Sequence, residues 1–382
     1  MNVTLFKSIF FSLVMSTTTV LAQGSIQIDK EMQQAIEKIA ENSVPGISVA
    51  IVKGNNIIWS GAAGYSNIEE NRIISQSHLF GIGDITNQYV GAVIIQLAEE
   101  GIVDLNATPQ DILGGVVSNI ENADTANLYQ LLNHTSGIYS WSDDADWARR
   151  GRGVQMNPKY LWRRDEPLKY TTRNLHSATN PPGEVYAFSK TNYTILGLII
   201  EKLTGGPLET EIRNRIFTPL NLRNTYYDSY EVVPNGSLVG NYHLATDLFI
   251  SKVGINAKFA FGADQLINTS GASLSVEGLA GGIVTSAREL ALFAASLWNG
   301  KILTPEKFKY IKPESINGHS GIHSEILGFT ADIRQIEASD LIIVSMVNLG
   351  VVNTGNSERK TFLDNYLDKI LIPIAKKYAQ VK

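Results

Sequence analysis

The chain has 382 residues, of which 44% are hydrophobic and 18% charged, which is typical of a globular protein with a substantial core. Its net charge of −5 and the lack of any run of like charges point to no nucleic-acid partner. The absence of cysteine excludes disulfides, thiolate metal ligands and a cysteine nucleophile. The histidines show no metal-ligand spacing, so neither a metal nor another cofactor is expected.

The first 22 residues have the pattern of a secretory signal peptide. Lys7 supplies the positive charge, Ile9–Met15 is a short apolar stretch, and Val20–Ala22 is a small-residue cleavage site. No later segment is long and apolar enough to cross a bilayer. We therefore expect an exported protein, periplasmic or secreted, whose mature part has no membrane span.

The N-terminal third predicts a helix, a hairpin and a second helix. Asp29 is the expected N-cap of a helix with one apolar face. Two strands, Ile47–Val52 and one that starts at Ile57, are joined by a turn at Gly54–Asn56. After Asp84, apolar residues at i, i+3, i+4 and i+7 predict a helix with a single buried stripe.

The middle of the chain is mostly helical and the C-terminal part returns to strands. Tyr193–Leu203 and Leu208–Ile216 are the clearest helical segments, and Thr285–Trp298 is another. Strands are expected at Gly328–Ile336 and Leu341–Asn348, and a closing helix from about Ser357 is interrupted near Pro373, because proline breaks helical hydrogen bonding. The sheet is therefore built from both ends of the chain.

Five segments of the chain correspond, in the same order, to motifs of a known protein family. Taken together they resemble the serine β-lactamase and penicillin-binding-protein family, in particular its class C-like and DD-peptidase members. The segments are Phe80–Asn87 with Gln96–Gly101, Leu131–Gly137, Pro182–Glu201, Gly281–Leu290 and Gly318–Gly321.

The resemblance implies an α+β fold, in which an antiparallel sheet flanked by helices carries an inserted, mostly helical region. Residues 23–382 would form one unit, with the sheet part at about 23–82 and 283–382 and the helical part at about 83–282. The cleft of the family lies between the two parts.

The catalytic motifs of that family are altered in this chain. The family's Ser-x-x-Lys motif carries the acylated serine and its activating lysine, and here Asp84 and Asn87 stand at those positions. The second motif, Tyr-x-Asn, is replaced by Phe188 and Lys190, with Ser189 between them. Acylation of a serine by the usual groups is therefore not expected.

The third motif corresponds to His319, Ser320 and Gly321, on a strand that lines the cleft in the family. Gly321 would leave room for a ligand to approach the backbone. His319 titrates near neutral pH in its unperturbed state, so it is a candidate for proton transfer.

The altered residues support three hypotheses. In the first, Asp84 is a general base, Lys190 is its partner, and His319 is a second acid, acting without acylation on a peptide-like or amide small molecule. Hydrolysis, cyclisation and elimination all fit, and the other residues at the motif positions would contact the substrate: Asn87, Phe188, Ser189, Ser320 and Gly321.

In the second hypothesis the protein is a pseudoenzyme in which Asp84 and Lys190 fill a dead site, and it binds peptidoglycan fragments or a protein partner. In the third, a displaced serine replaces the missing nucleophile. Ser136, Ser189 and Ser320 are the candidates, although none is followed by lysine at the required spacing.

Two further groups of residues have simpler interpretations. His134 is expected to be a structural hydrogen-bonding histidine. A group of arginines is expected to form a solvated loop rather than a carboxylate clamp, and the tryptophans near it are expected to pack in the core. These residues are Arg149, Arg150, Arg152, Arg163, Arg164, Trp141, Trp147 and Trp162.

Overall fold

The computed structural model describes residues 25–262, 264–311, 315–316, 319–336, 339–355 and 357–381. The expected signal peptide at residues 1–22 lies outside this part of the chain.

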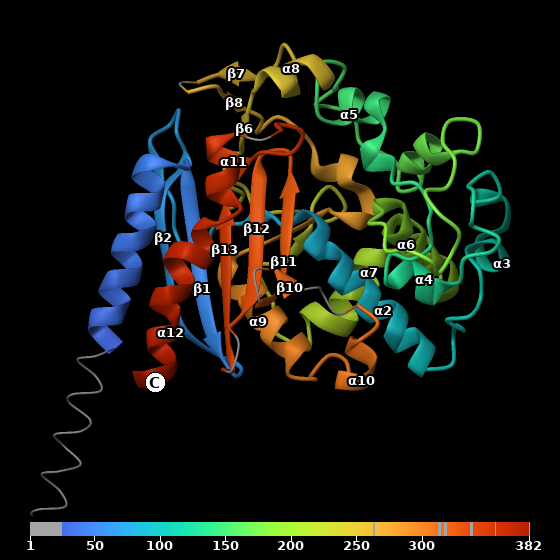
Figure 1. Ribbon diagram of the computed structural model, residues 1–382, viewed down its shortest axis with the longest axis horizontal. Coiled ribbons are helices and arrows are strands. Elements are labelled where there is room, and N and C mark those ends of the chain that lie inside the picture. Colours follow the sequence, from blue (N-terminus) through green and yellow to red (C-terminus); the bar gives the residue numbers. More distant parts are fainter. Residues whose placement is uncertain are drawn as a thin grey trace, which may run out of the picture.

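A seven-stranded antiparallel sheet built from both ends of the chain is the main element of the fold (Figure 1). Its strand order is β10-β11-β12-β13-β1-β2-β3, so the first and last thirds of the chain meet where β13 pairs with β1. The strands are β1 (Gly46–Lys53), β2 (Asn56–Asn67), β3 (Arg72–Ile73), β10 (Ser315–Ile316), β11 (His319–Ile326), β12 (Phe329–Gln335) and β13 (Leu341–Val347).

The central strands are apolar on both faces. Along β1, Ile47, Val49 and Ile51 pack on one side of the sheet, and Ala50 and Val52 pack on the other. A strand that alternates in this way between two buried faces needs a layer of helices on each side. The expected hairpin is confirmed, because β1 pairs with β2 directly.

The two faces of the sheet are covered by different parts of the chain (Figure 1). The helix at residues 25–42 lies beside α12 (Ile372–Val381), and both pack on the face that carries Ile47 and Val49, with α11 (Glu358–Leu363) in the same layer. The other face packs against α9 (Ala287–Trp298) and the helical region.

The helical region is assembled around two long helices, α2 (Thr86–Glu99) and α6 (Lys190–Thr204), which pack against each other. Shorter α-helices complete it: α3 (Pro109–Leu113), α4 (Leu128–Leu132), α5 (Ala145–Gly151), α7 (Leu208–Ile212), α8 (Asp247–Lys252) and α10 (Pro305–Phe308). The tight 3-10 turns are η1 (Gly83–Ile85), η2 (Gly114–Val116), η3 (Trp141–Asp143), η4 (Glu166–Thr171) and η6 (Leu274–Ala280), and the π-helical turns are η5 (Arg213–Phe217) and η7 (Leu367–Leu371).

Two small sheets join the helical region to the main sheet, and the sequence analysis did not anticipate them. One has the order β14-β6-β8-β7 and the other β4-β9-β5. Their strands are only two or three residues long, so no alternating pattern could reveal them: β4 (Phe80–Gly81), β5 (Tyr226–Tyr227), β6 (Tyr242–Leu244), β7 (Ala260–Phe261), β8 (Leu266–Asn268), β9 (Ile283–Thr285) and β14 (Leu349–Gly350).

The expectation of a single buried stripe on α2 is wrong. Eleven of its fourteen residues are buried, including the polar Thr86, Asn87 and Gln88. The helix packs against α6, α7 and η6 in the interior, so its polar side chains are enclosed as well. A buried helix of this kind places polar groups where only other protein groups or a ligand can satisfy them.

Of two expected features of the terminal helices, the Asp29 cap is wrong and the interruption near Pro373 is confirmed. The first helix begins by residue 25, so Asp29 lies inside it and accepts a hydrogen bond from the Tyr378 hydroxyl at 2.7 Å instead of capping the helix. The C-terminal helix is interrupted at η7, before Pro373, which sits in the first turn of α12. Proline is well tolerated there because the amide at that position has no intrahelical partner.

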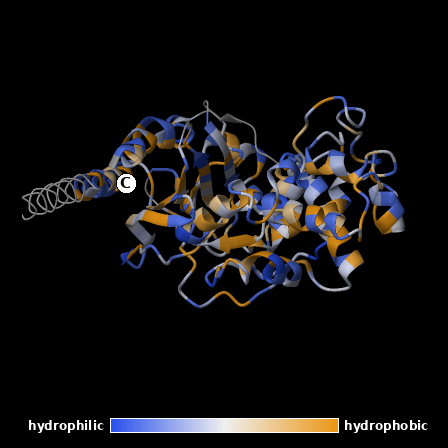
Figure 2. Ribbon diagram, turned by 90° about the horizontal axis from the view of Figure 1, so that it is seen from below, coloured by the Kyte–Doolittle hydropathy of each residue, from blue (hydrophilic) through white to orange (hydrophobic). Residues whose placement is uncertain are grey.

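Apolar residues are spread through the fold and alternate with polar ones along the helices (Figure 2). None of the described helices combines the length and the apolar character needed to cross a membrane.

Candidate functional site

Asp84 stands in η1, at the entrance to α2, where the backbone is held tightly. Gly83 has a φ of +49°, and a Cβ on it would lie 2.5 Å from Ser324 Oγ. The Asp84 amide donates a hydrogen bond to that same oxygen at 2.8 Å. Ser324 therefore occupies a backbone donor that would otherwise be available to an anion at this turn.

Lys190 is the first residue of α6 and reaches Asp84 directly. Its Nζ lies 2.9 Å from Asp84 Oδ1, and its side chain is only 4% exposed. The backbone amide of Lys190 donates to Ser140 Oγ at 3.0 Å, which fixes the start of the helix. Lys190, expected as the partner of Asp84, thus forms an ion pair with it that is largely buried.

The ion pair continues into a network that the sequence analysis missed. Glu277, in η6, accepts from Lys190 at 2.8 Å and from Arg152 Nη2 at 2.8 Å. Both Glu277 and Arg152 are about 2% exposed or less. Asp84, Lys190, Glu277 and Arg152 form a chain of alternating charge, which we name the four-charge network.

Two tryptophans cover the cations of this network. The guanidinium of Arg152 lies 4.6 Å from the Trp147 ring, and Lys190 Nζ lies 5.6 Å from the Trp141 ring. Aromatic faces attract cations, and they also keep water away from the charges. The expectation that these tryptophans pack in the core is confirmed, since both are fully buried.

The network shifts the pKa of each carboxylate differently. Burial raises the pKa of Asp84, although Lys190 opposes the shift, and 18% of the side chain remains exposed. Burial also acts on Glu277, but the two cations beside it outweigh that effect and lower its pKa to about 2. Burial lowers the pKa of Lys190, yet the charges of Asp84 and Glu277 prevail and its net pKa is raised.

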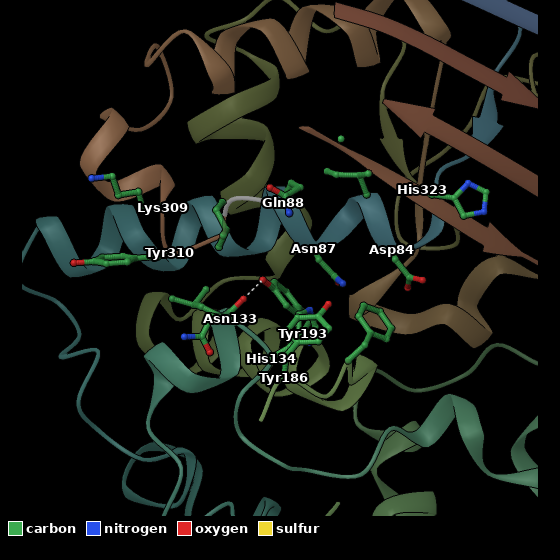
Figure 3. A pocket seen from close by; sticks show the side chains of 15 residues that line it. Asp84, Asn87, Gln88, Asn133, His134, Tyr186, Tyr193, Lys309, Tyr310 and His323 are labelled. Carbon is green, nitrogen blue, oxygen red and sulfur yellow. Dashed lines mark hydrogen bonds between the residues drawn. The ribbon is translucent and has the colours of Figure 1, made fainter. Parts of the chain in front are cut away.

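A cavity of about 470 Å³ opens beside Asp84 (Figure 3). Apolar and aromatic side chains form much of its wall, and polar groups from α2 and from the segment after α4 face into it. Its lining residues are Asp84, Asn87, Gln88, Leu132, Asn133, His134, Tyr186, Phe188, Tyr193, Lys309, Tyr310, Ile311, Gly321, Ile322 and His323. A pocket of this size and mixed lining is typical of a small-molecule site.

Two buried amide side chains of α2, Asn87 and Gln88, line this cavity and have oxygens without hydrogen-bond partners among the described residues. Asn87 is 3% exposed and Gln88 is 8% exposed. Asn87 Oδ1 and Gln88 Oε1 have no hydrogen-bond partner within the described chain. Both oxygens are enclosed by the protein, so neither is open to a ligand in the cavity as the side chains stand.

The structure separates the other predicted residues into two groups. Phe188 and Gly321 line the cavity with Asp84 and Asn87. Ser189 is fully buried at the N-cap position of α6, behind Phe188, and does not line the cavity. Gly321 is also required by packing, because a Cβ would lie 2.2 Å from the Ile333 carbonyl oxygen on β12.

His319 and Ser320 lie at the start of β11 and are not among the described residues that line the cavity. Alternation along the strand places His319 on the same face as His323 and opposite Ser324, which contacts Asp84. The structure therefore brings Asp84 and Lys190 together but does not bring His319 to them.

A second ionic cluster lies where β11 and β12 meet α11. His323 Nδ1 lies 2.9 Å from Asp332 Oδ1, and its Nε2 lies 3.1 Å from Glu325 Oε1. These carboxylates raise the pKa of His323 to about 10 against the effect of burial. His323, Glu325 and Asp364 are close enough to hold a metal, but Lys360 already contacts both acids, at 2.7 and 3.1 Å.

The arginines do not form the single solvated loop that was expected. Arg152 belongs to the four-charge network, and Arg164 binds Glu201 and Glu209 at 2.5 and 2.7 Å. Arg149, Arg150 and Arg163 are exposed as expected, and Arg163 pairs with Asp165 two residues away. The sequence provides no sign of the partners of Arg152 and Arg164, because the acids come from separate helices.

This arrangement of sheet, helical insert and cleft defines a protein of the β-lactamase and transpeptidase fold. Residues 29–323 match the Beta-lactamase family, and the chain belongs to that family. The D-amino acid amidase from Ochrobactrum anthropi SV3, in complex with D-phenylalanine, superimposes with a TM-score of 0.77. The match covers 93% of this chain and all of the amidase chain, at 19% identity, so it shows the shared fold.

Curated relatives have similar sequences over part of their length. Protein flp of Staphylococcus aureus strain N315 is 29% identical over 209 residues, and penicillin-binding protein 4 of Amycolatopsis lactamdurans is 28% identical over 187. The matches cover 53% and 48% of this chain. The chain spans 39% and 45% of those proteins' lengths, so the match is to less than half of each.

Proposed function

We propose that this protein is a hydrolase that cleaves an amide or peptide-like small molecule without forming an acyl-enzyme. The observation that carries the proposal is the carboxylate of Asp84, which faces a 470 Å³ cavity while Lys190 holds it at 2.9 Å. An exported location, supported by residues 1–22 alone, is part of the same proposal.

In the proposed reaction Asp84 is the general base. Its carboxylate takes a proton from water as the water oxygen bonds to the amide carbon, and the carbonyl electron pair moves to oxygen. When the tetrahedral intermediate collapses, the C–N bond breaks and Asp84 returns the proton to the leaving nitrogen. Burial suits this role, because it raises the pKa of Asp84 and makes the carboxylate a stronger base.

Lys190 is the positioning partner in this scheme. Its ammonium is held between Asp84 and Glu277, and the raised pKa of Lys190 keeps it charged, so it orients the base and does not itself remove a proton. His319 has no part in the proposed step, since it does not line the cavity.

A displaced serine receives little support from the geometry. The Ser136 hydroxyl donates to Asn192 Oδ1 at 2.7 Å, and Ser189 is fully buried. Ser324 is the serine nearest to Asp84, and its oxygen accepts from the Asp84 amide. Neither Ser136 nor Ser324 contacts a described histidine or lysine that would activate it.

The second candidate function is ligand binding without catalysis. It is favoured because groups of the four-charge network already have partners within the protein. Lys190 is already satisfied by two carboxylates, and the Asp84 amide is satisfied by Ser324. In that case the cavity would bind an amide-containing ligand, such as a peptidoglycan fragment, and leave it intact.

Hydrolysis of D- and L-phenylalanine amide, measured as the release of ammonia, tests the proposal. Asp84→Asn keeps the shape of the side chain but removes the base, so we expect turnover to fall by about 10²-fold or more. Asp165→Asn, at an exposed surface pair, is the matched control and should leave turnover unchanged. Labelling by a fluorescent penicillin or a fluorophosphonate should be absent.

Three results would decide against parts of this scheme. Undiminished turnover in Asp84→Asn refutes the general-base role. Covalent labelling by either reagent restores the serine hypothesis. Binding of phenylalanine amide without any turnover supports the second candidate.

A further inference from the structure

Two side chains on the cavity wall across from α2 have their hydrogen-bonding direction set by the backbone. Asn133 and His134 follow α4 directly and line the cavity, and Figure 3 places them across it from Asn87 and Gln88. His134 has a φ of +57°, which is uncommon for a residue other than glycine. The strained turn places both side chains at the cavity.

The orientation of the Asn133 amide is fixed by Thr135. Asn133 Oδ1 accepts from the Thr135 amide at 3.1 Å and from the Thr135 hydroxyl at 2.6 Å. A backbone N–H can only donate, so Oδ1 must be the atom that faces Thr135, and the two N–H groups of Nδ2 must point away from it. No described residue accepts a hydrogen bond from Nδ2.

The tautomer of His134 is fixed in the same way by Ser189. The Ser189 amide donates to His134 Nδ1 at 3.2 Å, so Nδ1 carries no proton and Nε2 carries one. Burial lowers the pKa of His134 to about 3, so the ring is neutral at physiological pH. Nε2 donates to no described residue, and three aromatic rings surround the imidazole, at centroid distances of 4.6 to 5.8 Å.

Building on the proposed function, we propose that Asn133 and His134 form a neutral donor pair that binds the carbonyl oxygen of the ligand. Both donors stand on one wall of the cavity, and a pair of neutral donors matches the carbonyl oxygen of an amide.

The charge of the donors selects between substrate and product. Neutral donors bind a neutral carbonyl well, whereas a carboxylate product would also meet the negative charge of Asp84 in the same cavity. The donor pair therefore favours a neutral amide, ester or peptide carbonyl over the acid that hydrolysis releases. His134 thus acts in specificity, in contrast to the structural role that its sequence motif indicated.

Imidazole ¹⁵N NMR of the full chain tests the tautomer and the contact. We expect His134 to keep its proton on Nε2 from pH 5 to 8, and we expect benzamide to shift the Nε2 resonance. Benzylamine, which lacks the carbonyl, should leave that resonance nearly unchanged. A proton on Nδ1, or no shift at up to 50-fold molar excess of benzamide over protein (~50 equivalents), refutes the proposal.

Asn133→Asp offers a second test that does not disturb the turn, because a carboxylate still accepts from Thr135. It replaces the Nδ2 donors with an acceptor, so we expect benzamide binding to weaken about tenfold, while benzylamine binding does not weaken. Asn157→Asp is the matched control, because Asn157 Oδ1 accepts from the Lys159 amide in the same local motif, away from the cavity. Equal weakening in both variants refutes the donor pair.

The two proposals fail in different ways. If Asp84→Asn keeps full turnover while benzamide still shifts His134, the general-base function is wrong and the donor pair stands as a binding site. If Asp84→Asn abolishes turnover and benzamide leaves His134 unshifted, the base is supported and the donor pair is wrong.

Discussion

Replacing Lys190 with methionine tests whether the four-charge network acts as a unit. Lys190 Nζ contacts Asp84 at 2.9 Å and Glu277 at 2.8 Å, and its side chain is 4% exposed. Removing one partner of a buried ion pair costs about 3–5 kcal/mol, because the remaining charge is left without compensation. We expect the lower end of this range, about 3 kcal/mol.

Two features of the structure place the cost at the lower end. Arg152 still binds Glu277 at 2.8 Å after the change, so that carboxylate keeps one cation. Asp84 is 18% exposed and its pKa is already raised by burial, so it can take up a proton when Lys190 is absent. The loss of stability should therefore be greater at pH 8 than at pH 5.

Urea denaturation followed by tryptophan fluorescence measures the effect as a double-mutant cycle with Asp84→Asn. The double variant contains no uncompensated charge at position 84, so we expect a coupling energy of at least about 1 kcal/mol between the two sites. Lys169→Met is the control, because Lys169 forms a pair with Glu166 while 44% exposed, and such surface pairs contribute about 0–1 kcal/mol. If Lys190→Met costs no more stability than Lys169→Met, the four charges do not act as a unit. The same conclusion follows if the effects of Lys190→Met and Asp84→Asn are strictly additive.

Two other changes probe the same site. The pKa of Glu277 falls from 4.5 unfolded to about 2 folded, so its stabilising effect is complete above pH 4.5 and is lost as pH falls toward 2. Glu277→Gln should flatten the acid limb of the stability curve measured by urea denaturation, and an unchanged limb would contradict the assignment. Gly83→Ala should destabilise by about 1–3 kcal/mol, because its φ is +49° and its Cβ would lie 2.5 Å from Ser324 Oγ. Thermal unfolding measures this loss, and adding Ser324→Ala to the Gly83→Ala variant should recover part of it. If Gly83→Ala is as stable as the unaltered protein, the turn has room for the added Cβ and the reasoning is wrong.

Much of the fold was predictable because its signals are local. The hairpin of β1 and β2, the helix α9 and the strands β12 and β13 each follow from periodicity within a single segment. The motif order indicated the family, and the match over residues 29–323 confirms it. Turn chemistry and apolar spacing carry such information without reference to the rest of the chain.

The errors arose where tertiary contacts override local pattern. The apolar spacing of α2 predicted one buried stripe, but packing against α6, α7 and η6 encloses most of the helix. Asp29 has the composition of a helix cap, yet it bonds to Tyr378, 349 residues away. In both cases the contacting group lies in another element, and no window of sequence includes both.

The candidate site shows the same division. Motif alignment indicated that Asp84 and Lys190 face each other, but it contained no sign of Glu277, which lies 87 residues beyond Lys190. His134 was recognised only as a structural histidine. Its direction as a donor depends on Ser189, 55 residues away.

The sequence by itself determined which residues stand where the resemblance places the family motifs, namely Asp84, Asn87, Phe188 and Lys190, since the identity of each residue can be read directly at its position. Only the tertiary structure decided that Asp84 is held by a chain of four charges and lines a cavity of about 470 Å³. The physical reason is that pKa shifts, tautomers and unsatisfied oxygens depend on burial and on neighbours from distant segments. Packing of the whole chain creates those neighbours.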